Sequence, residues 1–192
     1  ETVGRAMCKD DEIMLLDEND LPVRPGEVGE FCARGPYTLR GYFNAPEHNT
    51  RAFTKDGFYR SGDLMRQHKS GNYIVEGRKK DLINRGGEKI SAEEVENLIL
   101  GSPKIKNVAC VAMPDPVLGE KMCAFVILKE NEKLTLDELN TMLLQHEIAK
   151  FKLPERLEVV DMFPLSTFGK VSKKDLVAIV TKKLQQDDDR GA

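Results

Sequence analysis

The sequence predicts an α+β protein in which the end of an antiparallel β-barrel subdomain is followed by a small α+β domain with three helices. In the first part, short runs of β-forming residues alternate with Gly, Pro and Asn, which is typical of antiparallel strands joined by turns. In the second part, helix-capping signals precede apolar residues at helical spacing. We place the boundary between residues 1–79 and residues 80–192, where the β pattern gives way to a densely charged stretch.

Five short strands are expected in the first part. Gly35-Pro36 follows the second run of β-forming residues, and Lys69-Ser70-Gly71-Asn72 separates the last two. Regularly spaced short strands with such turns favour a small antiparallel sheet or barrel. The expected strands cover residues 12–17, 28–33, 37–43, 58–59 and 73–75.

Three helices are expected in the second part because one capping signature occurs three times. A Ser or Thr is followed three residues later by Glu or Asp, and such side chains satisfy free backbone N–H groups at a helix start. Apolar residues at helical spacing follow each signature. The expected caps are Ser91, Thr135 and Ser172. In the last helix, the residues expected to face inward are Leu176, Ile179, Val180 and Leu184. Strands are expected at residues 107–113, 122–128 and 157–160, and the polar tail, residues 185–192, is expected to fray.

The composition argues against two classes of partner. The 192 residues carry a net charge of −3 and a pI of about 5.8, so bulk binding to nucleic acid is not expected. No apolar run approaches the roughly 20 residues that a membrane-spanning helix needs, so no membrane partner is expected. The first residue is Glu1 and no signal sequence follows it, so we expect the chain to be cut from a longer protein.

The cysteines and histidines favour neither disulfides nor a metal site. No Cys-X-X-Cys pair occurs, and two of the cysteines lie in apolar, strand-like runs, so buried free thiols are expected. Free thiols favour a reducing, cytoplasmic compartment. The histidines are scattered, so no metal ligand is assigned. The residues concerned are Cys8, Cys32, Cys110, Cys123, His48, His68 and His146.

Three segments are candidates for chemistry, and the first is Tyr59-Arg60-Ser61-Gly62-Asp63. A Gly before an Asp at a strand end can present a carboxylate on a tight turn, and a carboxylate suits the two hydroxyls of a ribose. Taken alone, the segment is better interpreted as a turn in which Asp63 bonds to its own backbone.

The second candidate segment, residues 77–89, holds five cations and two anions in a chain that is acidic overall. Its Gly86-Gly87 pair would let a backbone approach a ligand closely, and a basic cluster beside glycines suits a phosphate-bearing partner. By itself, however, the segment is better explained as a solvated hairpin with Gly-Gly as its turn.

The third candidate segment, residues 163–172, joins an expected strand to an expected helix. Gly169 frees the backbone, and Lys170 lies just before the helix that Ser172 caps. An ammonium group beside the free N–H groups of a helix start is a plausible clamp for developing negative charge. An exposed loop lysine explains the same residues and is the better explanation of this segment alone. The segment is not a phosphate-binding P-loop, because G-X-X-X-X-G-K-[ST] is absent.

Together, in this order and spacing, the three segments resemble the adenylate-forming superfamily of acyl-CoA synthetases, nonribosomal-peptide adenylation domains and luciferases. Residues 59–63 look like its Y-[RK]-T-G-D motif, residues 77–96 like its hinge-and-loop motif and residues 164–170 like its C-terminal Gly-Lys motif. Residues 34–42, 45–49 and 83–90 are most similar to stand-alone aryl-acid ligases such as 2,3-dihydroxybenzoate–AMP ligase.

The resemblance implies a role for each matching residue. Asp63 would hold the ribose hydroxyls of the nucleotide, Arg78 would add a second contact, and Val75 would pack near the ribose. Lys80 would be the hinge about which the C-terminal domain swings. Lys170 would bind the carboxylate and α-phosphate oxygens during adenylation, and Gly86 and Gly87 would line a channel for a phosphopantetheine thiol. Two departures from the family pattern are mild: Ser61 replaces the usual Thr, and Lys80 replaces the Asp of many relatives.

The implied protein is an ATP-dependent ligase of siderophore biosynthesis. Residues 1–79 would end its large N-terminal adenylation domain, and residues 80–192 would be its mobile C-terminal domain. It would activate an aromatic acid, 2,3-dihydroxybenzoate or salicylate, and load an aryl carrier protein. Mg²⁺ would be needed, with ligands outside this chain, and the chain alone is expected to be inactive. An aryl- or fatty-acyl-CoA ligase and a non-catalytic interaction module of the same fold are the alternatives.

Overall fold

The computed structural model describes residues 2–191, with side chains for residues 2–187. The chain divides into two compact units, residues 1–80 and residues 81–192, and each is described here by itself. None of the helices in the described residues is both long and apolar enough to cross a bilayer.

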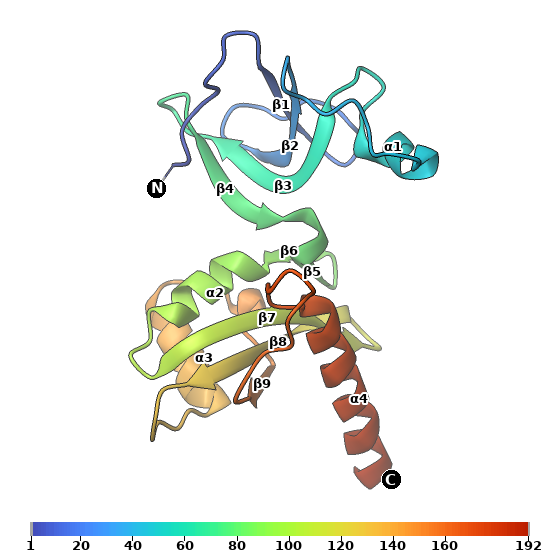
Figure 1. Cartoon of the computed structure of the whole chain (residues 1–192). Coiled ribbons are helices and arrows are strands. Elements are labelled where there is room, and N and C mark those ends of the chain that lie inside the picture. The colour runs from blue at the N-terminus through green and yellow to red at the C-terminus, as the bar shows by residue number, and fades with distance from the viewer. Residues whose placement is uncertain (1, 192) are drawn as a thin grey trace. The chain divides into compact units, whose positions relative to one another are not determined.

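The first unit is an antiparallel sheet whose four strands follow one another in chain order (Figure 1). The outer strands, β1 and β4, are not paired with each other along the described residues, so the sheet is open and forms no closed barrel. The antiparallel arrangement agrees with the prediction. The elements are β1 (Glu12–Leu16), β2 (Val28–Arg34), α1 (Pro46–Ala52), β3 (Tyr59–Gln67) and β4 (Tyr73–Arg78).

The strand predicted at residues 37–43 is wrong, because this segment is irregular. The Asn49 side chain takes both backbone groups of Tyr42: it accepts the N–H at 2.7 Å and donates to the carbonyl at 2.9 Å. These bonds replace the ladder partners that a strand would need. Asn49 lies on α1, a helix that begins at Pro46 and that the sequence patterns did not predict.

The second unit is built on the long β7–β8 hairpin. β5 pairs with the start of β8, β9 pairs in parallel with its later part, and β6 pairs with β5. Within residues 81–191 the structure has three α-helices, as predicted. The elements are β5 (Leu82–Arg85), β6 (Glu88–Ser91), α2 (Ala92–Leu100), β7 (Ile105–Asp115), β8 (Gly119–Leu128), α3 (Leu136–Gln145), β9 (Arg156–Val159) and α4 (Lys173–Gly191), with the short 3₁₀ turns η1 (Lys79–Asp81) and η2 (Lys150–Lys152).

Both faces of the β7–β8 hairpin are buried, which explains why its sequence is apolar almost throughout. Successive side chains of a strand point to opposite faces. Val108 and Cys110 join the cluster beneath α2 and α3, whereas Ala109 and Val111 join the cluster beneath α4 (Figure 1). The hairpin is therefore the core layer of the second unit.

The helices of the second unit begin at the predicted caps, but two other expectations about α4 are corrected. The Thr135 hydroxyl accepts the N–H of Glu138, whose carboxylate accepts the N–H of Thr135 in return, a complete capping box. On α4, however, Ile179 is 39% exposed instead of facing inward. The tail predicted to fray continues α4 as far as Gly191.

Replacement of Phe125 tests the role of this hairpin. Phe125 is fully buried on β8, so Phe125→Ala should lower the free energy of unfolding of the second unit by about 3–5 kcal/mol. Phe168→Ala is the matched control, because Phe168 is 90% exposed and should change the value by less than about 0.5 kcal/mol. Urea denaturation followed by circular dichroism measures both, and equal effects would contradict the described core.

Candidate functional site

The Tyr59–Asp63 segment forms a bulge inside a strand, not the turn at a strand end that the sequence suggested. Cys32 pairs with Arg60 and Glu30 pairs with Leu64, so three residues of β3 lie opposite one residue of β2. Gly62 supplies the positive φ of +74° that this bulge requires. The bulge ends directly at Asp63.

The Ser61 hydroxyl closes the bulge. It donates to the Phe31 carbonyl at 2.9 Å and accepts the backbone N–H of Asp63 at 3.0 Å. Phe31 is the single β2 residue opposite the bulge, so its carbonyl would otherwise lose its ladder partner. A hydroxyl at position 61 is therefore a structural requirement of this conformation, and either Ser or Thr supplies it.

Asp63 and Arg78 form an ion pair across β3 and β4. The two residues are paired in the ladder, and the Arg78 Nε lies 2.8 Å from the Asp63 Oδ1. Their side chains are 26% and 51% exposed, so both remain accessible. Val75 pairs with Met65 further along the same two strands and is 36% exposed.

A hollow of about 300 Å³ lies beside this pair. Two residues of the bulge line it, and so do three consecutive cations of the segment that leads out of β4. Arg78 and Lys79 are already paired with Asp63 and Glu30, so Lys80 is the lining cation best placed to meet an anion such as a phosphate group. The structure therefore brings Lys80 together with Arg78 and the bulge. The lining residues are Ser61, Gly62, Arg78, Lys79 and Lys80.

A buried ion network lies behind the bulge, and the sequence patterns gave no sign of it. Glu30 is only 5% exposed, and its Oε2 accepts from Arg60 at 3.0 Å and from Lys79 at 2.9 Å. Arg60 also donates to Asp20 at 2.6 Å, and this bond holds the pKa of Asp20 below its usual value. Burial, and secondarily the charge of Glu30, raises the pKa of the Cys32 thiol to about 11. Cys32 is accordingly a neutral thiol at physiological pH.

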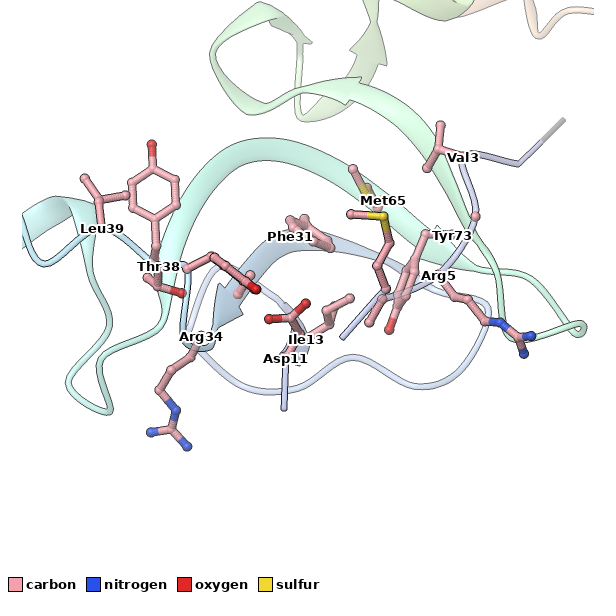
Figure 2. Close-up of a pocket in the computed structure, with 16 residues that line it drawn as sticks. Val3, Arg5, Asp11, Ile13, Phe31, Arg34, Thr38, Leu39, Met65 and Tyr73 are labelled. Carbon is pink, nitrogen blue, oxygen red and sulfur yellow. The ribbon is translucent and has the colours of Figure 1, made fainter. Parts of the chain in front are cut away.

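A larger pocket of about 440 Å³ lies between the N-terminal segment and the sheet (Figure 2). Its walls are mainly apolar, with Phe31, Met65 and Tyr73 prominent, whereas the guanidinium groups of Arg5 and Arg34 point away from it (Figure 2). None of the predicted site residues lines this pocket. Its wall includes Tyr59 of the Tyr59–Asp63 segment, whose pKa is raised chiefly by the hydrogen bond with the Tyr42 hydroxyl.

Gly86 and Gly87 are the two-residue turn of the β5–β6 hairpin, with φ of +59° and +97°. The Gly86 N–H donates to the Leu118 carbonyl at 2.8 Å, and a Cβ at Gly86 would lie 3.0 Å from the Leu118 side chain. Gly87 faces open space. The close approach at Gly86 is thus to the chain itself, and only Gly87 leaves room for another molecule.

Lys170 lies on a closed loop that leads into α4. The backbone of Ser166 donates to the Lys170 carbonyl at 2.7 Å, and the Ser166 hydroxyl accepts the Lys170 N–H at 3.2 Å. The side chain of Lys170 is exposed. Ser172 caps the helix behind it by accepting the N–H of Asp175 at 3.4 Å. The loop therefore fixes the backbone of Lys170 and leaves its ammonium group accessible.

The start of α4 is itself held in place by Glu96 of α2. One oxygen of Glu96 accepts from the Lys173 ammonium at 2.7 Å and from the backbone N–H of Cys110 at 2.6 Å. Lys173 is the first residue of α4, so this contact fixes the helix just after the Lys170 loop. The sequence signal was weak, because Glu96 forms no local motif with its partners.

The predicted site residues are thus divided between the units. Asp63, Val75, Arg78 and Lys80 belong to the first unit, whereas Gly86, Gly87 and Lys170 lie on two turns of the second. Among the described residues no group of three or more His, Cys, Asp or Glu side chains could hold a metal ion. No Mg²⁺ ligand is therefore assigned to these residues.

Comparison with known proteins identifies the family. Residues 94–170 match the AMP-binding enzyme C-terminal domain. A salicylyl-CoA synthase / salicylate adenylyltransferase of a Streptomyces species is 56% identical over 95% of the chain, which covers 33% of that protein. The 2,3-dihydroxybenzoate-AMP ligase of Bacillus subtilis is 48% identical over 95% of the chain and 34% of its own length. Residues 94–170 belong to the AMP-binding enzyme C-terminal domain family, and the whole chain is similar to the C-terminal part of these adenylate-forming relatives.

The solved structures show the same fold. ATP-bound MatB from Rhodopseudomonas palustris matches 94% of the chain with a TM-score of 0.85 and 29% identity, over 36% of its own length. The chain spans about a third of the length of these AMP-binding relatives. The α+β fold and the family resemblance of the motifs are thereby confirmed, and the roles of individual residues stay predictions.

Removal of the Ser61 hydroxyl tests the description of the bulge. Ser61→Ala should lower the free energy of unfolding of the first unit by about 1–2 kcal/mol, because two hydrogen bonds are lost. Ser61→Thr keeps the hydroxyl and should recover most of this loss. Ser70→Ala, in the exposed turn between β3 and β4, is the control and should have little effect. A loss no larger than that of the control would contradict the role of Ser61.

Proposed function

We propose that this chain is part of an ATP-dependent enzyme that adenylates an aromatic acid, 2,3-dihydroxybenzoate or salicylate. The enzyme then transfers the acyl group to the phosphopantetheine thiol of an aryl carrier protein in siderophore biosynthesis. The names of two relatives support this substrate class, salicylate adenylyltransferase and 2,3-dihydroxybenzoate-AMP ligase. A third relative, enterobactin synthase component E of Escherichia coli, supports the assignment to siderophore biosynthesis. The observation that carries the proposal is the accessible Asp63–Arg78 pair beside a cationic hollow.

In this proposal the first unit binds the nucleotide. The Asp63 carboxylate has lone pairs left after its bond to Arg78 Nε, and these accept the two ribose hydroxyls. Arg78 pairs with the carboxylate and contributes further N–H donors. The exposed Val75 side chain packs near the ribose, and the cationic hollow favours the phosphate end of the nucleotide.

The first reaction joins the acid to AMP. A carboxylate oxygen of the acid attacks the α-phosphorus of ATP, and the bond from that phosphorus to the bridging oxygen breaks, so that pyrophosphate leaves with the electron pair. Lys170 stabilises the negative charge on the reacting oxygens, and its exposed ammonium group on a fixed backbone suits that task. Bound Mg²⁺ would supply charge neutralisation to the triphosphate, and no ligand for it is assigned among the described residues.

The second reaction moves the acyl group to a thiol. The sulfur attacks the acyl carbon, and AMP leaves with the electrons of the anhydride bond. The domain that contains residues 80–192 turns about Lys80, which withdraws Lys170 and presents the Gly86-Gly87 turn to the thiol. A side chain at Gly87 would meet no other atom within 4 Å of its Cβ, so this position gives the pantetheine arm room to pass.

Coenzyme A is the alternative acceptor. Two relatives carry it in their names, the salicylyl-CoA synthase and the 2-hydroxy-7-methoxy-5-methyl-1-naphthoate--CoA ligase of Streptomyces carzinostaticus. The carrier-protein hypothesis is favoured by residues 34–42 and 84–90, which are similar to the carrier-loading aryl-acid ligases. A non-catalytic module of the same fold is disfavoured because Asp63, Arg78 and Lys170 are all retained.

Lys170→Ala tests the proposed adenylation in the full-length enzyme. Loss of one charge-stabilising group should lower the rate of aryl-acid-dependent pyrophosphate exchange by roughly 10²–10³-fold. Lys174→Ala removes a nearby exposed lysine and should leave exchange unchanged. The 192-residue chain alone, expected to be inactive, serves as the blank. Undiminished exchange in the Lys170 variant would refute the role given to that residue.

The acceptor is tested separately with the unmodified full-length enzyme. With ATP, Mg²⁺ and either salicylate or 2,3-dihydroxybenzoate, mass spectrometry should detect the aryl thioester on the phosphopantetheine arm of an aryl carrier protein. In parallel reactions coenzyme A should give much less thioester. Efficient formation of aryl-CoA with no loaded carrier protein would replace the carrier-protein hypothesis by the CoA-ligase alternative.

A further inference from the structure

We propose that Glu30 is a positioning residue of the nucleotide site, acting through Arg60 and Lys79. The inference rests on the proposed function, in which Asp63 and Arg78 bind the nucleotide. Glu30 lies on β2, which carries none of the proposed contact residues. Its carboxylate nevertheless holds both chain segments that carry them, through its bonds to Arg60 and Lys79.

The burial of Glu30 makes the network obligatory. A carboxylate that is 5% exposed has lost nearly all contact with water, and cations and hydrogen-bond donors have to replace it. Arg60 and Lys79 supply these donors at 3.0 Å and 2.9 Å, both on the same oxygen. Without Glu30 these two cations would face each other without a shared anion, so the network would open.

The two cations flank the nucleotide contacts in the chain. Arg60 is the last residue paired with β2 before the bulge that ends at Asp63. Lys79 follows Arg78 in the chain, so the bond from its ammonium group to Glu30 restrains the segment that carries Arg78. A single buried carboxylate thereby sets the position of both members of the Asp63–Arg78 pair, whose Nε–Oδ1 distance is 2.8 Å.

The same contact marks the fixed end of the proposed hinge. Lys79 is tied to β2, whereas the side chain of the next residue, Lys80, is exposed. The first unit ends at Lys80. Glu30 thus confines any rotation to residue 80 and beyond, which would leave the nucleotide contacts undisturbed while the other domain moves.

The test compares Glu30→Gln with Glu12→Gln. Glu12 also forms an ion pair within the first unit, with Arg34 at 2.8 Å, but it is exposed and lies on β1, which does not pair with β3 or β4. In the 192-residue chain, hydrogen exchange of the amides of residues 77–80 should be about fivefold faster or more in Glu30→Gln. The Glu12→Gln variant should exchange at the unmodified rate there.

In the full-length enzyme, Glu30→Gln should raise the KM for ATP in pyrophosphate exchange by roughly tenfold, with a much smaller change in kcat, because the binding contacts are displaced. A general loss of folded enzyme would lower the apparent kcat and leave KM unchanged. Lys79→Gln removes the same Lys79–Glu30 ion pair by changing Lys79, whose side chain is 48% exposed. This variant replaces Glu30→Gln in the test if Glu30→Gln does not fold. If Glu30 acts through Lys79, the double variant should be little worse than Lys79→Gln alone.

Asp63→Asn separates this inference from the proposed function. If Asp63→Asn raises the KM for ATP and a folded Glu30→Gln variant does not, Glu30 is not a positioning residue and the inference is overturned. If Asp63→Asn has no effect on that KM, the nucleotide role of Asp63 fails, and with it the proposed function. Unchanged amide exchange in a folded Glu30→Gln chain would also overturn the inference.

Discussion

The pairing of β2 with β3 has to fit three residues of one strand against a single residue of the other, and the first unit is organised around that mismatch. Phe31 keeps its carbonyl satisfied only because the Ser61 hydroxyl reaches it. The same hydroxyl accepts the N–H of Asp63, whose carboxylate pairs with Arg78 of β4. A local defect in a ladder thus becomes the means by which two strands present an ion pair.

The second unit is organised around a buried hairpin instead of a bulge. The β7–β8 hairpin is buried on both faces, and capped helices cover it. The Lys170 loop projects from this rigid layer with its backbone closed by Ser166 and its exit fixed by the Glu96–Lys173 contact. The loop backbone is therefore hydrogen-bonded at Ser166 and Lys170, while the side chain of Lys170 is exposed.

Local signals predicted the three helices of the second unit, because a cap and its partner lie three residues apart, whereas α1 has no such cap and was missed. Thr135 and Glu138 satisfy each other whatever the rest of the chain does. The irregular segment at residues 37–43 was mistaken for a strand because its β-forming side chains say nothing about Asn49, which takes its backbone partners. The β-propensity of residues 37–43 favours a strand, but the hydrogen bonds from the Asn49 side chain to Tyr42 replace those that a strand would form.

The site could be predicted only through its resemblance to a family. Spacing alone could not place Asp63 opposite Arg78, since bulges shift the register on both sides of β3. Glu30 escaped notice altogether, because its partners lie 30 and 49 residues away and no local pattern links a buried Glu to them. Networks of this kind are specified by the fold and are visible only once it has formed.

The contact of Glu96 with Cys110 has one more consequence. Among the described strands, β7 forms an outer edge of its sheet, and an edge strand with free N–H groups invites pairing with a strand of another molecule. Glu96 occupies the N–H of Cys110 near the middle of that edge and places a negative charge there, partnered by Lys173. The carboxylate that steadies α4 thus also discourages the self-association to which an open sheet edge is prone.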